Sequence, residues 1–149
     1  MKNIFFLILI NLVSTSFIYA QSKTNDKQTH AIYSLIDQYS LAREKRDTVL
    51  LKSILRTDID QLVSSGEWRS GLKESTVGMM RSSANSTGTR TLKVEKIRFL
   101  NSECAIVDAR YEIQNANGSI RKMWSTFIVV DDKRGWKISA IRNMLPAPQ

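Results

Sequence analysis

The stretch that decides the fold is RTLKVEKIRFLNSECAIVDARYEIQNANGSIRKMWSTFIVVDDKRGWKISAIRNML, residues 90–145. It contains four strand-like runs, at residues 90–101, 103–114, 120–132 and 134–145, separated by short turn sequences rich in Asn, Ser, Asp and Gly. Consecutive strands joined by short turns predict an antiparallel meander.

The two faces of these strands differ in composition. In the run at 103–114, Ala105 and Val107 share one face, and Asp108 and Arg110 share the other. The last two runs carry apolar residues on both faces, and such strands are normally covered on both sides. We therefore expect one face of the sheet to pack on helices and the other, outer face to form a homodimer.

The residues before the meander predict helices. Five apolar side chains at helical spacing predict a first helix over residues 27–46, namely Ile32, Leu35, Ile36, Tyr39 and Ala42. Asp47 is placed to cap a second, shorter helix. A strand at 58–63, a turn at 64–66, a short return strand at 67–70 and a third helix at 71–83 follow. Gly78 costs about 1 kcal/mol of helix stability relative to alanine, which weakens the prediction of the third helix. Helices followed by a run of strands indicate an α+β domain.

The first 20 of the 149 residues have the layout of a secretory signal peptide. One positive charge at Lys2 precedes an apolar run at 4–13, and small residues lead to Ala20. The run is too short to span a bilayer, which takes about 20 apolar residues. We expect an exported, periplasmic or extracellular protein without a stable membrane anchor. It would have a flexible lead-in at 21–26, one domain at 27–145 and a tail at 146–149.

Composition removes several classes of function. The chain has a net charge of +8, but its Lys and Arg residues are dispersed and form no nucleic-acid motif, so no nucleic-acid partner is expected. Cys104 is the only cysteine and His30 the only histidine. A multi-histidine metal site and a Ser-His-Asp triad are therefore not expected. No glycine-rich phosphate loop or cofactor fingerprint occurs, so neither a metal nor a cofactor is expected.

Three short stretches resemble the nuclear transport factor 2-like superfamily, in particular its SnoaL-like and SgcJ/EcaC-like members. They are Arg46–Leu51, then Asp58-Ile59-Asp60 with Gly66 and Gly71, and finally Arg134–Ala140 followed by Arg142-Asn143. The resemblance implies a cone-shaped, curved antiparallel sheet wrapped around N-terminal helices, with a pocket at its open end. The family often has a His-Asn pair where this chain has Arg142-Asn143, so a role that needs an imidazole there is not carried over.

The candidate site is a pocket for a small apolar organic ligand. Asp60 is the candidate catalytic base, and the alternative is that Asp60 is a surface carboxylate paired with an arginine. The other candidate pocket residues are Tyr33, Trp68, Met80, Asp108, Tyr111, Trp124 and Arg142. The leading hypothesis is an exported ligand-binding domain. One alternative is a cofactor-free isomerase or lyase that uses Asp60, and another is a structural or interaction module.

Overall fold

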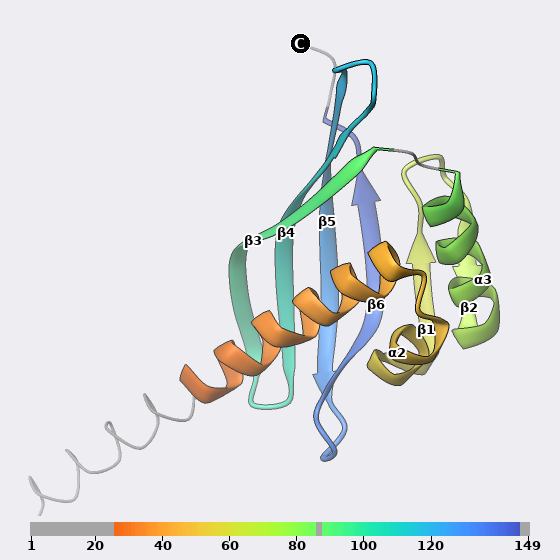
Figure 1. Cartoon of the computed structure of the whole chain (residues 1–149). Coiled ribbons are helices and arrows are strands. Elements are labelled where there is room, and N and C mark those ends of the chain that lie inside the picture. Colours follow the sequence, from red (N-terminus) through yellow and green to blue (C-terminus); the bar gives the residue numbers. More distant parts are fainter. Residues whose placement is uncertain (1–25, 86–87, 147–149) are drawn as a thin grey trace, which may run out of the picture. The chain divides into compact units, whose positions relative to one another are not determined.

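The computed structural model describes residues 26–85 and 88–146 (Figure 1). The predicted signal peptide, residues 21–25 of the lead-in and residues 147–149 of the tail lie outside this described part. The chain divides into two compact units, residues 1–31 and residues 32–149. In the first unit, residues 26–31 are helical. The features described below all belong to the second unit.

The described residues of the second unit form three helical segments and six strands. Residues 32–45 are helical. They are followed by α2 (Thr48–Ile54), β1 (Leu55–Leu62), β2 (Trp68–Ser70), α3 (Gly71–Ala84), β3 (Thr89–Asn101), β4 (Cys104–Gln114), β5 (Ile120–Asp131) and β6 (Trp136–Met144). The predicted cap is confirmed, because Asp47 Oδ1 accepts hydrogen bonds from the backbone N–H groups of Val49 and Leu50, both at 2.9 Å. Among the described residues, no helix has the length and apolarity needed to cross a membrane.

The six strands form one sheet in the order β2-β1-β6-β5-β4-β3. The predicted meander is confirmed, since β3 to β6 pair antiparallel with their neighbours in the chain. The expectation of an entirely antiparallel sheet is wrong at one place, because β1 runs parallel to β6 and pairs Leu62 with Arg142. Short turns impose antiparallel pairing, but β2, α3 and strands β3 to β5 lie between β1 and β6 in the chain, so this pair is free to be parallel.

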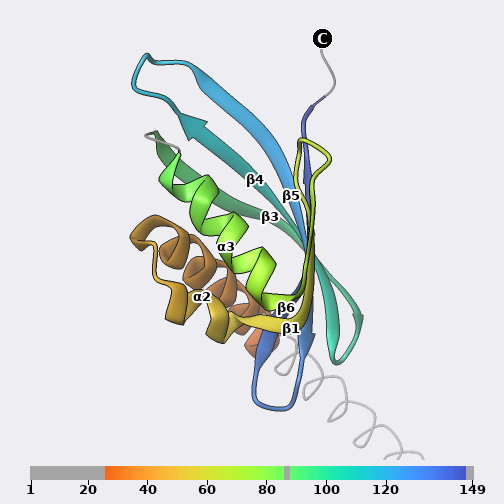
Figure 2. The ribbon, with the colours of Figure 1, turned by 90° about the vertical axis from the view of Figure 1, so that its right-hand side faces the viewer.

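The helices cover one face of the sheet, which we call the inner face. Figure 2 shows α2 and α3 on this side of the curled sheet, and we call the opposite side the outer face. The core between helices and sheet includes Ile36, Leu51, Met79, Phe127 and Ile138, each at most 1% exposed. Tyr39 packs edge-on against Phe127, with ring centroids 5.2 Å apart. Alternation along each strand then places every second side chain on the outer face.

Candidate functional site

A cavity of about 550 Å³ lies on the inner face, bordered by the helix at 32–45, the β1–β2 turn, the last turns of α3 and strands β3 to β6. We call it the inner cavity. The charged side chains that line it are Arg43, Arg69, Arg81, Arg90, Arg121 and Glu67. Its other lining residues include Tyr39, Tyr111 and Gln61. The prediction of an apolar pocket is therefore wrong, because this cavity is polar and is lined by five arginines and one carboxylate.

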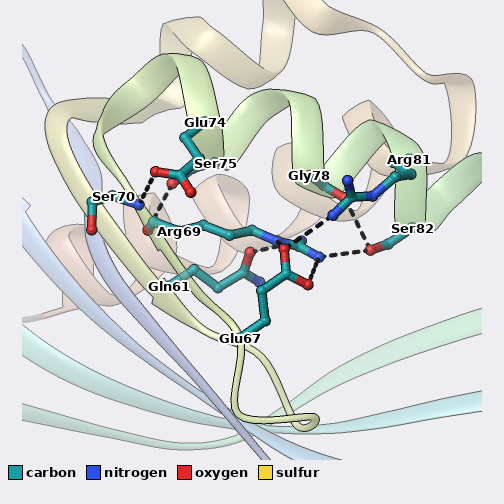
Figure 3. Close-up of polar contacts among 9 residues, drawn as sticks. All are labelled: Gln61, Glu67, Arg69, Ser70, Glu74, Ser75, Gly78, Arg81 and Ser82. Carbon is teal, nitrogen blue, oxygen red and sulfur yellow. Dashed lines mark hydrogen bonds and ion pairs between the residues drawn. The ribbon is translucent and has the colours of Figure 1, made fainter.

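Arg69 occupies the centre of a buried polar network at one end of the inner cavity (Figure 3). Its side chain is 4% exposed, and Gln61 is 2% exposed. Arg69 donates to both carboxylate oxygens of Glu67, from Nε at 3.0 Å and from Nη2 at 3.2 Å. It also donates to Gln61 Oε1 at 3.2 Å and to Ser82 Oγ at 3.3 Å. The guanidinium thus joins β2, β1 and α3, and its buried N–H groups have partners.

Glu67 is shared between two arginines. Arg81 donates to Glu67 Oε1 at 3.0 Å, the same oxygen that accepts from Arg69 Nε. The hydrogen bond from Arg69, together with the charges of Arg69 and Arg81, lowers the pKa of Glu67 below its ordinary value. Glu67 therefore stays ionised at neutral pH and is poorly suited to accept a proton from a substrate.

Gly78 allows the Arg69 side chain to lie against α3. A Cβ atom at position 78 would come within 2.4 Å of Arg69 Nε and 2.5 Å of Arg69 Cδ. The backbone of Arg69 is fixed as well, since Ser75 Oγ donates to its carbonyl oxygen at 3.2 Å. A glycine inside a helix normally weakens that helix. Here it provides the space in which the buried guanidinium reaches its partners.

The three remaining arginines of the inner cavity contact neutral groups. Arg43 donates to Ser83 Oγ and to the Tyr39 hydroxyl, both at 2.8 Å. Arg90 donates to two backbone carbonyl oxygens, and Arg121 donates to Ser64 Oγ at 2.9 Å. Within residues 26–85 and 88–146, none of these three arginines forms an ion pair with a carboxylate.

Of the site residues that the sequence suggested, Tyr111 lines the inner cavity. Burial raises the pKa of its hydroxyl, while the charges of Arg43, Arg90 and Arg121 act in the opposite direction. The hydroxyl therefore remains protonated at neutral pH and can donate a hydrogen bond to a ligand.

The other suggested residues lie outside the inner cavity. Met80 lines a separate groove between α2 and α3, and Tyr33 is 42% exposed. The remaining five lie on the outer face: Asp60, Trp68, Asp108, Trp124 and Arg142. Three of them are in contact, since Arg142 contacts both Asp60 and the Trp68 ring. Thr126 Oγ1 donates to Asp108 Oδ1 at 2.7 Å, and the Arg110 guanidinium lies 5.7 Å from the centre of the Trp124 ring.

Asp60 has the partner that the alternative hypothesis gave it. Arg142 Nη2 donates to Asp60 Oδ2 at 2.8 Å, and the Arg142 guanidinium lies 4.8 Å from the centre of the Trp68 ring. Because Ile59 and Gln61 point inward and are buried, Asp60 between them points outward. The structure therefore does not place Asp60 in the pocket where it was expected to act as a base.

We expect Asp60→Asn to lower the free energy of unfolding slightly, by about 0.5–1 kcal/mol. The substitution keeps the shape of the side chain but removes its charge, and the Asp60 and Arg142 side chains are 37% and 31% exposed, so solvent screens the pair. Urea denaturation at pH 7 measures the change. A gain in stability would contradict this assignment and would favour the hypothesis that Asp60 is a catalytic base.

The arginines that distinguish the inner cavity were not singled out from the sequence. The sequence pattern that indicates two of them is a basic residue two positions before an apolar residue that faces inward on the same strand. Arg121 precedes Met123 by two residues on β5, and Arg90 precedes Leu92 by two residues on β3. Each lies near the start of its strand, where basic residues are common on protein surfaces, so the pattern becomes informative only when the strands are paired.

Comparison with known proteins identifies the fold. No family model matches the chain, and no curated protein matches it. Among solved structures, a domain of unknown function with a cystatin-like fold from Nostoc punctiforme matches with a TM-score of 0.72 at 17% identity, over 82% of this chain and 79% of that one. A nuclear transport factor 2-like protein of unknown function from Shewanella oneidensis matches with a TM-score of 0.66 at 18% identity, over 78% and 98%.

A ketosteroid isomerase-like protein from Erwinia carotovora also matches, with a TM-score of 0.65 at 14% identity, over 80% of this chain and 96% of that one. At such identities these likenesses establish the fold alone. The chain has the cystatin-like, nuclear transport factor 2-like fold, which confirms what the sequence resemblance implied. Proteins with this fold differ in function, so the function has to be argued from the site.

Proposed function

We propose that this chain is a small-molecule-binding domain whose ligand is an organic anion held in the inner cavity. The observation that carries the proposal is the charge of the lining, five arginines against the single carboxylate Glu67. Guanidinium groups in a partly enclosed space are costly unless an anion neutralises them. A cavity of about 550 Å³ falls within the range of pockets that hold small organic molecules.

A panel of small organic acids and their neutral amides, screened by thermal unfolding, tests this function. A ligand that binds only the folded state stabilises it, by about 2.7 kcal/mol at a concentration 100 times its dissociation constant. We expect at least one acid to raise the melting temperature and its amide to have no effect. Equal effects of acids and amides, or no effect of any acid at millimolar concentration, would contradict the proposal.

The isomerase or lyase alternative lacks a supporting observation in the described residues. The structural relatives include the ketosteroid isomerase-like protein and a candidate scytalone dehydratase from Novosphingobium aromaticivorans, which matches with a TM-score of 0.70 at 14% identity over 85% of this chain and 89% of that one. The hypothesis for this chain required a carboxylate base in the pocket. Asp60 lies outside the inner cavity, and Glu67 is neutralised by Arg69 and Arg81.

We also propose that the domain acts after export. The support is the order of charged, apolar and small residues over positions 1–20. We expect the exported protein to begin at Gln21, and N-terminal sequencing of protein from the periplasm or medium checks it. Recovery of protein that still begins at Met1 from that fraction would contradict the prediction.

We further propose that two copies pair through their outer faces. The helices lie on the other side of the sheet (Figure 2), and Trp68 and Trp124 remain 53% and 39% exposed on this one. Charges of both signs, such as Arg110 and Asp108, also occur here, so the face can complement a second copy of itself. We expect a dimer at micromolar concentration in light scattering, and Trp124→Glu to shift it to a monomer. A monomeric parent protein would contradict the proposal.

A further inference from the structure

Three arginines of the inner cavity have no carboxylate partner among the described residues, and their charges limit the kind of anion that fits. Arg69 and Arg81 both already contact the carboxylate of Glu67. Arg43, Arg90 and Arg121 form no ion pair with a carboxylate in the described part of the chain. These three arginines are the ones available to a ligand.

Strand pairing brings two of the three together. Ile113 on β4 pairs with Arg90 on β3 and with Arg121 on β5, so these residues form one row across the inner face. Neighbouring strands are about 4.8 Å apart, which places the Cα atoms of Arg90 and Arg121 about 10 Å apart. Both arginines line the same cavity, and side chains of that length can reach one ligand from either side.

Arg43 joins the row from the helix at 32–45. Arg43 Nε donates to Ser83 Oγ at 2.8 Å, and Arg90 Nη2 donates to the Ser83 carbonyl oxygen at 3.2 Å, so both guanidinium groups meet at one residue of α3. Tyr111 lies two residues from Ile113 on β4, on the same face. All three arginines line the inner cavity together with Tyr111, and their charges act to lower the pKa of the Tyr111 hydroxyl.

The donors of this cluster are not saturated. Arg90 Nε is buried and has no hydrogen-bond partner among the described residues. Within residues 26–85 and 88–146, Arg43 and Arg121 donate only to neutral hydroxyl groups. A guanidinium forms its strongest hydrogen bonds with carboxylate or phosphate oxygens, often two at a time. The unpaired Nε and these weakly engaged groups are the contacts that an oxyanion would complete.

We infer that the ligand carries two negative charges, as a dicarboxylate or a phosphate monoester, and that Arg43, Arg90 and Arg121 bind it around the Tyr111 hydroxyl. This inference rests on the proposed function and specifies its ligand class. A singly charged anion would leave two of the three guanidinium charges unbalanced. A dianion balances two charges and offers enough oxygen atoms to accept from all three arginines and from Tyr111.

Isothermal titration calorimetry with four probes of similar size tests the inference: benzamide, benzoate, phthalate and phenyl phosphate. We expect phthalate or phenyl phosphate to bind at least tenfold more tightly than benzoate, and benzamide to show no binding. Which of the two dianions binds more tightly distinguishes a dicarboxylate site from a phosphate site. Benzoate binding as tightly as both dianions would overturn the inference and leave the proposed function intact. Failure of all three anions to bind at millimolar concentration would overturn both.

Two arginine variants localise the binding. Arg121→Gln is expected to lower the affinity for the tighter-binding dianion at least tenfold, because it removes one of the three positive charges. Arg56→Gln makes the same charge change on an exposed side chain that pairs with Asp58 outside the inner cavity, and should change the affinity less than twofold. Circular dichroism confirms that both variants are folded. Equal losses in the two variants would show that the protein attracts the dianion by net charge alone, which would overturn the inference.

Discussion

Arg69→Ala is expected to lower the free energy of unfolding by about 3 kcal/mol, within the range found when a large buried side chain is truncated. The guanidinium is 4% exposed and connects Glu67, Gln61 and Ser82 across two strands and α3. Its removal leaves a void and deprives the buried amide of Gln61 of a donor. Chemical denaturation of the variant and the parent protein measures the loss.

The chain contains a matched control for this substitution. Arg56 also binds a carboxylate two residues away through two hydrogen bonds, at 2.7 and 3.0 Å to Asp58. That pair is exposed, with side-chain exposures of 36% and 63%, so solvent screens it and Arg56→Ala should cost much less stability than Arg69→Ala. Similar losses in both variants would contradict a structural role that depends on the burial of Arg69.

Gly78→Ala is expected to lower the free energy of unfolding by about 2 kcal/mol, the cost of forcing an extra methyl group into a packed site. Helix propensity alone predicts the opposite sign, a gain of about 1 kcal/mol. The reason for the reversal is the 2.4 Å approach between the new Cβ and Arg69 Nε, an atom that hydrogen bonds to Glu67 hold in place. Thermal or urea denaturation determines the sign.

A double variant separates this contact from other effects of the new methyl group. In an Arg69→Ala background the opposing side chain is absent, so adding Gly78→Ala should raise stability by about 1 kcal/mol through helix propensity. The same loss in both backgrounds would show that position 78 requires glycine for a reason other than Arg69.

Local sequence signals predicted the elements of the fold. Asp47 was recognisable as a cap because its hydrogen bonds are to the next few residues. The alternation of apolar and polar residues along β4 predicted its two faces, because this pattern is also local in the sequence. The parallel pairing of β1 with β6 had no such signal, because it joins residues about 80 positions apart and depends on how the whole sheet closes.

The candidate site was harder to predict, because a site depends on which faces meet. Asp60 lies between Ile59 and Gln61, and only the burial of both neighbours shows that it points outward. Gly78 was interpreted as a weakness of α3, since its contact is with a side chain of another element. Arg43, Arg90 and Arg121 are separated in the chain, and they become a cluster only when Ser83 and the row through Ile113 bring them together.

The claim that the inner cavity is the functional site can be tested most directly by methyl NMR during titration with the anion that binds best. Met123 and Ile113 line the cavity, whereas Ile106 and Ile128 lie on the outer face of the same two strands. We expect the methyl signals of Met123 and Ile113 to shift and saturate with the ligand, while those of Ile106 and Ile128 stay in place. Saturating shifts confined to Ile106 and Ile128 would place the ligand on the outer face and contradict the claim.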